Sequence, residues 1–248
     1  MLAFDPDTWY ETLEGRYLED LAFSEVRRAL QALSTVYVER RDRIGGGALD
    51  GRGKRSAFGL FFGPLHFFVV RHVVRELGAS TPPPKRIVDL GCGTGAAGAA
   101  WALETGGVSA IAGIDSSGWA VEEASWTYRS LGLTGSARCG NALEARIGGA
   151  GQGVLAAFTI NELDDTARAT MRDRLLRAHG AGSRILIVEP IARRAFPWWP
   201  AWSEPLLAAG GREDEWRFAA AFPERMRLLD RAAGLHHREL TARSIWLG

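Results

Sequence analysis

The stretch RIVDLGCGTGAAG, residues 86–98, has the pattern of a short apolar strand, a glycine loop and the start of a helix. Gly91, Gly93 and Gly95 allow a tight turn and let a ligand approach the backbone closely. The helix that follows offers N–H groups without helical partners and the positive end of its dipole. The stretch therefore predicts the first strand, ligand loop and helix of an α/β fold.

The same alternation of strand and helix continues towards the C-terminus. Four further apolar segments alternate with helical patterns, at residues 110–115, 136–139, 154–160 and 184–190. This alternation predicts a parallel sheet covered by helices on both faces. Segments 236–240 and 244–248 are predicted as an antiparallel pair, because their connection is too short for parallel strands. We expect a Rossmann-like α/β fold whose seven-stranded sheet is mostly parallel and ends in an antiparallel hairpin.

The first part of the chain has helical patterns only. Ser24 is predicted to cap a helix whose buried stripe, at three- and four-residue steps, consists of Val26, Leu30, Leu33 and Tyr37. A second apolar helix is predicted over residues 56–77, where Pro64 should kink the helix or mark its start. Its apolar face is expected to consist of Phe58, Phe62, Leu65, Val69 and Val73.

The proline-rich segment STPPPK, residues 80–85, is a stiff linker and predicts a domain boundary. We therefore expect a helical N-terminal cap at residues 1–80 and an α/β domain at residues 81–248. Within that domain, residues 191–222 are predicted to form an insert rich in tryptophan and arginine.

Composition excludes several classes of protein. The net charge is +1, so charge alone gives no argument for nucleic-acid binding. Cys92 and Cys139 are far apart in sequence, which predicts a reducing compartment and no disulfide, zinc or iron–sulfur site. The N-terminus has no apolar run, and no uncharged apolar stretch is long enough to span a bilayer. We expect a cytoplasmic protein with no membrane partner and no metal.

Asp89 distinguishes two interpretations of the glycine loop. The loop also fits the dinucleotide pattern G-x-G-x-x-A, which by itself is weakly specific. An aspartate two residues before the first glycine would repel a pyrophosphate, whereas it would attract an ammonium group. S-adenosylmethionine carries an ammonium and a sulfonium and has no phosphate. The remaining alternative is that Asp89 and Asp115 are only capping or turn residues.

The segment VDLGCGTG resembles the first motif of class I S-adenosylmethionine-dependent methyltransferases. The resemblance implies S-adenosyl-L-methionine as cofactor, with Asp115 at the end of the second strand accepting hydrogen bonds from both ribose hydroxyls. It also implies that Asn141, after the third strand, lies near the adenine amine, because an amide carbonyl can accept that hydrogen bond. The predicted cofactor-binding residues are Asp89, Gly91, Cys92, Gly93, Gly95, Asp115, Ser116, Asn141, Ala142 and Thr159.

INEL, residues 160–163, and VEP, residues 188–190, resemble a second group. The ribosomal small-subunit methyltransferase-like family, which includes mitochondrial ribosome-assembly members, has Asn-Glu-Leu and Val-Glu-Pro at these two strands. This resemblance implies an RNA or a ribosomal particle as partner, although members often carry a cluster-binding cysteine set that this chain lacks. The Asn/Asp-Pro-Pro-aromatic motif of amino-group methyltransferases is absent at the fourth strand.

The candidate catalytic residues are Asn161 and Glu162, because ligands of open α/β sheets bind beyond the carboxyl ends of the strands. Glu162 and Glu189 are the candidate bases. Asp164 or Asp165 is predicted to cap the helix that follows. The candidate substrate contacts are Glu189, Arg193, Trp199 and His66.

The candidate substrate contacts and the basic residues also have purely structural interpretations. The tryptophans of the insert could form a lid over an RNA or small-molecule acceptor, or could pack on the N-terminal helices. His66 could be a core histidine. The basic residues of the cap could form an RNA-binding patch or a solvated helix face; they are Arg40, Arg41, Arg43, Arg52, Lys54 and Arg55.

The sequence thus predicts an S-adenosylmethionine-dependent methyltransferase whose acceptor is an rRNA-like RNA or a small molecule. The alternative is a non-catalytic, cofactor-binding factor for ribosome assembly. A dehydrogenase is the third interpretation. The sequence leaves the acceptor atom and the oligomeric state open.

Overall fold

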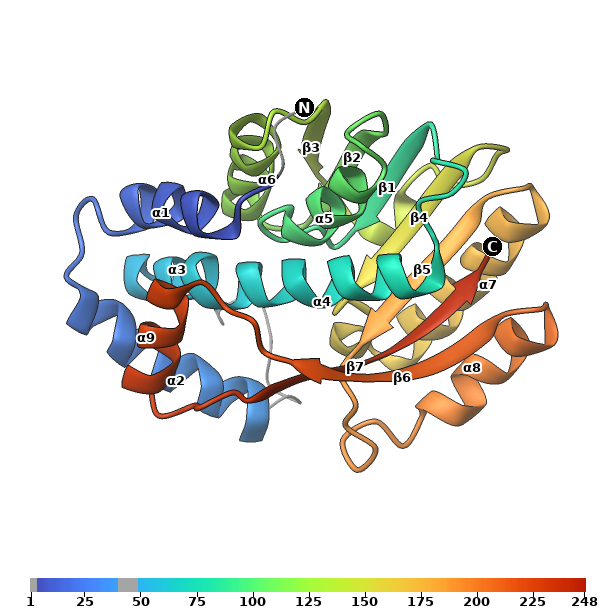
Figure 1. Cartoon of the computed structure of the whole chain (residues 1–248). Coiled ribbons are helices and arrows are strands. Elements are labelled where there is room, and N and C mark those ends of the chain that lie inside the picture. Colours follow the sequence, from blue (N-terminus) through green and yellow to red (C-terminus); the bar gives the residue numbers. More distant parts are fainter. Residues whose placement is uncertain (1–3, 40–48) are drawn as a thin grey trace. The chain divides into compact units, whose positions relative to one another are not determined.

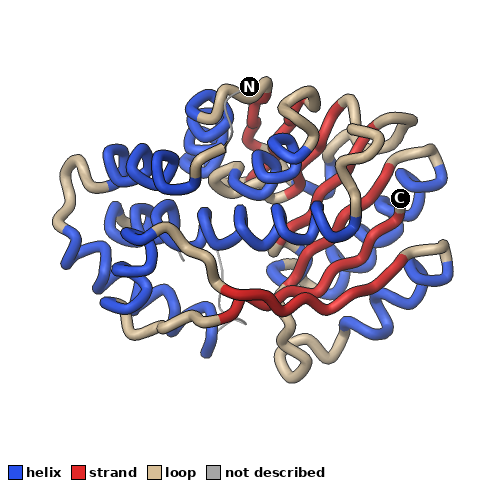
Figure 2. The backbone as a smooth tube through the Cα atoms, in the orientation of Figure 1, coloured by secondary structure: helices blue, strands red, loops and turns tan. Residues whose placement is uncertain are grey.

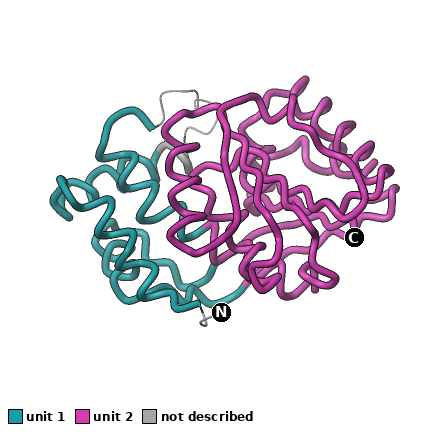
Figure 3. Tube along the Cα trace, turned by 90° about the horizontal axis from the view of Figure 1, so that it is seen from above, with its two compact units in different colours: residues 1–65, 218–240 teal, residues 66–217, 241–248 magenta. Residues whose placement is uncertain are grey.

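The computed structural model describes residues 4–39 and 49–248 (Figure 1). The chain forms two compact units, one of residues 1–65 with 218–240 and one of residues 66–217 with 241–248 (Figure 3). The division falls inside a helical segment rather than at the prolines of residues 82–84. The domain boundary predicted at residue 80 therefore differs from the edge between the compact units.

One seven-stranded sheet has the order β3-β2-β1-β4-β5-β7-β6 (Figures 1 and 2). Strands β1 to β5 pair in parallel, and β7 runs antiparallel to β5. The predicted Rossmann-like fold class is thereby confirmed. The strands are β1 (Arg86–Leu90), β2 (Ala110–Asp115), β3 (Gly135–Cys139), β4 (Gln152–Ala157), β5 (Arg184–Glu189), β6 (Arg212–Ala219) and β7 (Glu239–Leu247).

The last two strands differ from the predicted hairpin. The segments predicted as two strands, 236–240 and 244–248, belong largely to the single strand β7, and β6 comes from the predicted insert. Helix α9 (Glu224–Ala232) separates them along the chain. Residues 241–243, predicted as the connection between two strands, lie within β7, and Arg243 is buried there. From Glu213 onward, exposed residues alternate with half-buried ones in β6, and the many charges of this strand obscured the period of two.

Helices cover both faces of this sheet. On one face, α5 (Ala96–Glu104) packs on β1 and β2, and α6 (Gly118–Ser130) packs on β2 and β3. On the other face, α7 (Asp165–Gly180) and α8 (Trp199–Ala208) share one apolar core with β1, β4 and β5. Two short 3₁₀ helices follow β3 and β4, namely η3 (Ala142–Glu144) and η4 (Ile160–Glu162).

The N-terminal helices are α1 (Pro6–Tyr17), α2 (Phe23–Glu39) and a continuous helical segment made of α3 (Arg52–Ala57), η2 (Phe58–Phe62) and α4 (Gly63–Leu77). In α2, Val26, Leu30 and Leu33 are buried, as the predicted stripe requires; the side chain of Tyr37 lies outside the described residues. A π-helical turn, η2, precedes Pro64, whose missing N–H therefore falls in the first turn of α4.

The helical segment Arg52–Leu77 has the length and composition of a membrane span, with a mean hydropathy of 1.5 in its most apolar window. Within the described part of the chain, 67% of that window is buried inside the protein. Buried core helices meet the same criterion, so this segment is weak grounds for membrane insertion.

Candidate functional site

The glycine loop follows β1 at the carboxyl edge of the sheet. Gly91, Gly93 and Gly95 have φ angles of 65°, 50° and 76°, a region that favours glycine. A Cβ atom on Gly91 would lie 2.6 Å from Thr159 Cγ2, and one on Gly95 would lie 2.9 Å from Ala124 Cα. The loop is therefore restricted to glycine by its dihedral angles and by its packing.

Asp89 lies beneath this loop and is only 1% exposed. Its Oδ2 accepts a hydrogen bond from Gly98 N at 3.0 Å, which links β1 to the first turns of α5. Burial raises the pKa of Asp89 to about 7, the bond from Gly98 opposes this, and the charge of Asp115 adds to it. Asp89 thus contacts the backbone of α5 directly, and a cation bound above it would favour the ionised form of its buried carboxyl group.

Asp115, at the end of β2, holds the loop from the other side. Its Oδ2 accepts from Gly93 N at 2.9 Å, and its Oδ1 accepts from Ser117 N at 2.9 Å. The residue is half-buried, and the neighbouring Ser116 is exposed. The amide of Gly93, the kind of group that binds phosphate in glycine loops, is therefore already paired with a carboxylate.

Asn141 follows β3 and caps η3, because its Oδ1 accepts from Leu143 N at 2.9 Å. The side chain is exposed, and Ala142 is half-buried beside it. An amide oxygen has two lone pairs, so this bond leaves one acceptor position open. Cys92 lies inside the loop, 5% exposed, and burial raises the pKa of its thiol well above the usual value.

The tip of β4 has an unusual backbone. Phe158 has a φ of 56°, which is uncommon for a residue with a side chain, and its N–H donates to Val188 O at 2.8 Å. The Thr159 hydroxyl lies 2.9 Å from Leu90 O and 3.1 Å from Ala157 O, within donating distance of both. These bonds hold the tip between the ends of β1 and β5.

Glu189, the last residue of β5, is fully buried and faces the β4 tip. Its Oε1 accepts from Thr159 N at 3.0 Å and Ile160 N at 2.7 Å, and its Oε2 accepts from Asn161 Nδ2 at 2.5 Å. Burial raises the pKa of Glu189 to about 7, while these hydrogen bonds act in the opposite direction. One carboxyl group therefore organises three consecutive residues.

Glu162 ends the short helix η4 and has an exposed side chain. Neighbouring protein atoms nevertheless desolvate its carboxyl group, which raises the pKa to about 7. The charges of Glu189 and Asp115 raise the pKa further. The carboxyl edge of the sheet thus gathers carboxyl groups from β1, β2, β5 and η4. This arrangement favours a cationic ligand over an anionic one.

His66 is the one predicted substrate contact outside the strand ends that the structure brings to the β4 tip. Its ring stacks on Phe158 at 3.9 Å between centroids and an interplanar angle of 11°. Burial lowers the pKa of His66 to about 3, so the imidazole is neutral at physiological pH. Phe158 could not be predicted as a site residue, because an aromatic residue in an apolar strand gives no sign of a left-handed backbone.

The predicted insert does not form a lid of free tryptophans. Trp199 is 2% exposed within the core of β5, α7 and α8, its Nε1 donates to Glu213 Oε1 at 2.6 Å, and the Arg243 guanidinium lies 4.5 Å from its ring. Arg193 is exposed and forms an ion pair with Glu215 at 3.0 Å. Neither residue hydrogen-bonds the β4 tip, and α8 and β6 are regular parts of the fold rather than an insertion.

The predicted basic patch is described only in part. Arg52 forms an ion pair with Asp20, and Arg55 donates to Leu49 O at 3.2 Å. Arg40, Arg41 and Arg43 lie outside the described residues. Within the described ranges, no group of three or more His, Cys, Asp or Glu side chains could hold a metal ion.

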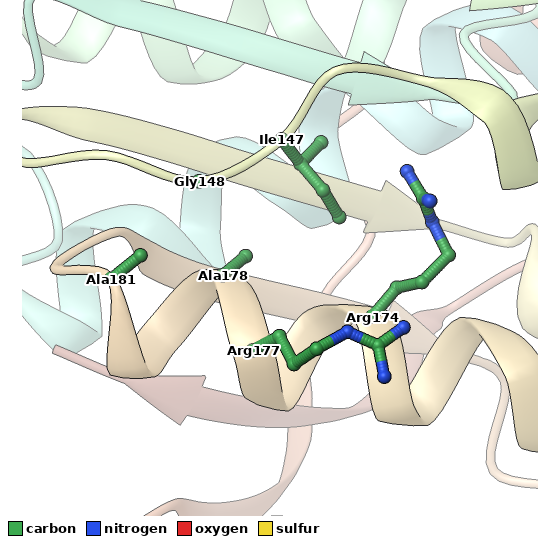
Figure 4. Close-up of a pocket in the computed structure, with 6 residues that line it drawn as sticks. All are labelled: Ile147, Gly148, Arg174, Arg177, Ala178 and Ala181. Carbon is green, nitrogen blue, oxygen red and sulfur yellow. The ribbon is translucent and has the colours of Figure 1, made fainter.

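A separate pocket of about 120 Å³ lies between the segment that leads into β4 and helix α7 (Figure 4). Two arginines reach it from α7. Its lining residues are Ile147, Gly148, Arg174, Arg177, Ala178 and Ala181. None of the predicted site residues belongs to this lining, so the pocket is distinct from the strand-end site.

No protein-family model matches the chain, and no curated protein sequence matches it significantly. Solved structures with a similar arrangement include a SAM-dependent methyltransferase from Aquifex aeolicus, at 17% identity and a TM-score of 0.47, covering 73% of this chain and 90% of that one. Another is a TehB-like SAM-dependent methyltransferase from Corynebacterium glutamicum, at 18% identity and a TM-score of 0.44, covering 69% and 85%. Both TM-scores lie below 0.5.

Proposed function

We propose that this chain is an S-adenosylmethionine-dependent methyltransferase. The observation that carries the proposal is the bond from Gly93 N to Asp115, together with the buried Asp89 below it. A glycine loop whose amide is paired with one carboxylate and underlain by another disfavours a pyrophosphate. The same loop suits a nucleoside that carries positive charge and no phosphate.

The residues around the loop fit the parts of this cofactor. Asp115 already accepts one bond at each oxygen, and each oxygen keeps a lone pair with which to accept a ribose hydroxyl. Asn141 and Ala142 offer an amide and a small apolar surface to the adenine. When bound, S-adenosylmethionine supplies an electrophilic methyl group. The protein's main contribution is then to align the acceptor with that group.

Asn161 and Glu162 are the proposed catalytic residues of the β4 tip. A carboxyl group whose pKa is about 7 can accept a proton near neutral pH, which suits Glu162 to an acceptor that must lose one. The neutral His66 ring is stacked on Phe158, and its pKa of about 3 makes it too weak a base for this task. Glu162 would act on an acceptor held beside Asn161.

The acceptor is proposed to be an RNA or a small molecule. The burial of Trp199 and Trp202, which are 2% and 5% exposed, removes them as stacking platforms for bases and favours the small molecule. Within the described residues, no observation favours the alternative of a non-catalytic assembly factor.

Two measurements test the proposal. Calorimetry should detect binding of S-adenosylmethionine or its demethylated product, and binding of a nicotinamide dinucleotide in their place would overturn the assignment. Incubation with tritiated S-adenosylmethionine and a cell extract, followed by separation of RNA, protein and small molecules, should place label in RNA or in the small-molecule fraction. Binding without labelling of any fraction would support the non-catalytic alternative.

A further inference from the structure

The side-chain amide of Asn161 is oriented by its neighbour. The ionised carboxylate of Glu189 can only accept hydrogen bonds, so in this form the amide presents Nδ2 to Oε2, which lies 2.5 Å away. The other end of the amide, Oδ1, then points away from Glu189. Within residues 4–39 and 49–248, Oδ1 accepts no hydrogen bond, and it is not among the buried unsatisfied atoms. Asn161 therefore offers an unused acceptor at the β4 tip.

We propose that Glu189 is a positioning residue, which holds Asn161 so that Oδ1 receives a hydrogen bond from the methyl acceptor. The substrate class that fits is an acceptor with an N–H or O–H group, which can donate to Oδ1, while one hydrogen of Nδ2 is already donated to Glu189. This inference rests on the proposed function. It replaces the predicted substrate contact by Glu189, whose side chain is fully buried.

The fold explains why Glu189 can take this role. The β4–β5 register pairs Ala157 with Val188, which brings the next residue of β5 alongside the β4 tip. Arg243 pairs with Glu189 in the β5–β7 register, but its Nε donates to Pro190 O at 3.0 Å and its guanidinium lies over Trp199. Within the described residues, the hydrogen bonds to the Glu189 carboxylate accordingly come from residues 159–161.

The orientation predicts the effects of two single variants. In Glu189→Gln the new amide must keep its oxygen towards Thr159 N and Ile160 N, so its NH₂ group faces Asn161. The Asn161 amide then turns over and presents Nδ2, the wrong group, to the substrate. In Asn161→Asp two carboxylates face each other across a separation that is 2.5 Å in the native pair, which displaces the side chain.

The double variant, Glu189→Gln with Asn161→Asp, restores the pattern with the roles exchanged. The introduced NH₂ group donates to the introduced carboxylate, whose second oxygen faces outward in place of Oδ1. Residues in direct contact are also coupled in stability, so the rescue supports positioning when the rate recovers without a matching recovery of the thermal midpoint.

The experiment measures initial rates of tritium transfer from S-adenosylmethionine to the extract fraction that the wild-type chain labels. Each single variant should lower the rate by about 10- to 100-fold, as misplacement of a reacting group does. The affinity for S-adenosylmethionine, measured by calorimetry, should stay within about twofold, and the double variant should regain about tenfold over either single variant. An unaffected Glu189→Gln variant, or a double variant slower than both singles, overturns the proposal.

A matched control is Asp230→Asn. Asp230 is also a buried carboxylate, 1% exposed, and accepts from His237 N at 2.9 Å in the other compact unit. This variant should lower the thermal midpoint and leave the rate of transfer unchanged. If Asp230→Asn loses as much rate as Glu189→Gln, the effect is one of stability and the positioning role fails.

A second readout keeps this inference separate from the proposed function. In ¹H–¹⁵N spectra, the side-chain amide of Asn161, assigned by its loss in Asn161→Ala, should shift in Glu189→Gln because a charge-assisted hydrogen bond disappears. An unchanged resonance overturns the positioning role even if the enzyme is active. Failure of the wild-type chain to bind S-adenosylmethionine overturns the proposed function, whatever the resonance shows.

Discussion

Asp115 is the residue on which the glycine loop depends most directly. Its two oxygens join the loop to the segment after β2, and in the proposed function both also accept the ribose hydroxyls. The role as a turn residue and the role as a ribose acceptor are therefore compatible. Only a binding measurement separates them.

Asp115→Ala should weaken S-adenosylmethionine binding by about 10- to 100-fold, since a hydrogen bond to a charged group contributes about 1.5–3 kcal/mol. Calorimetry checks the affinity. Asp164→Ala is the control, because Asp164 caps α7 through Ala167 N at 2.8 Å and lies outside the loop. Equal affinity of Asp115→Ala and wild type would remove Asp115 from the site.

Glu162 gives a pH dependence with a definite sign. Its pKa is about 7 in the folded chain and 4.5 without the fold, so between these values the folded state binds more protons. Stability contributed by this group is therefore lost as the pH rises from about 4.5 to 7. Glu162→Gln should raise the thermal midpoint at pH 8 and change it little at pH 4.5. A rise in the thermal midpoint at pH 4.5 but not at pH 8 would contradict the raised pKa of Glu162.

At the scale of elements, the β4 tip is the least regular part of the site. Phe158 adopts a left-handed backbone although it is not glycine, and the neighbouring residues are held by Glu189 and by Leu90 O. Such conformations cost free energy that surrounding contacts must offset. Here the stacking on His66 is one such contact.

Truncation of Phe158 to glycine should accordingly cost less stability than truncation to alanine. Phe158→Gly and Phe158→Ala both lose the stacking, but only alanine keeps the strain, so the glycine variant should be more stable by about 1 kcal/mol. Urea unfolding measures the difference. Ala157→Gly, one residue earlier in β4, is the control and should destabilise. The reverse order at position 158 would show that the left-handed backbone carries no strain.

The α7–α8 layer is a core element rather than a substrate lid. Trp199→Ala should reduce the free energy of unfolding by about 3–5 kcal/mol, because a large buried side chain is lost. Arg193→Ala, which breaks an exposed ion pair with Glu215, should change it by at most about 1 kcal/mol. Urea unfolding tests both variants. Comparable, small effects would mean that Trp199 lies at the surface.

At the scale of the whole molecule, β7 is an interior strand of the sheet. It lies between β5 and β6, and Ile245 and Leu247 are buried. Deletion of residues 244–248 removes the partners of residues 185–188 in β5 and should abolish the folded state by circular dichroism. Deletion of the exposed Gly248 alone should leave it intact. If the protein still folds without residues 244–248, this segment is a dispensable terminal hairpin strand rather than an interior strand of the sheet.

Much of the α/β unit could be predicted because its signals are local. The glycine loop of residues 91–95 needs left-handed backbone angles, and the apolar strands need burial on both faces. The end of the sheet was predicted less well. Polar residues inside β7 and charges along β6 are satisfied by contacts with segments distant in sequence, such as Arg243 with Pro190 O.

The Rossmann-like fold and the polar strand ends follow from the sequence alone, because both depend on periodicity and residue type within short segments. The partners of each polar group depend on the three-dimensional fold. It paired Asp89 with Gly98 and Glu189 with residues 159–161, and it placed Trp199 in the core. The physical reason is that a hydrogen bond or a buried contact between distant segments depends on strand order and register, which no single segment encodes.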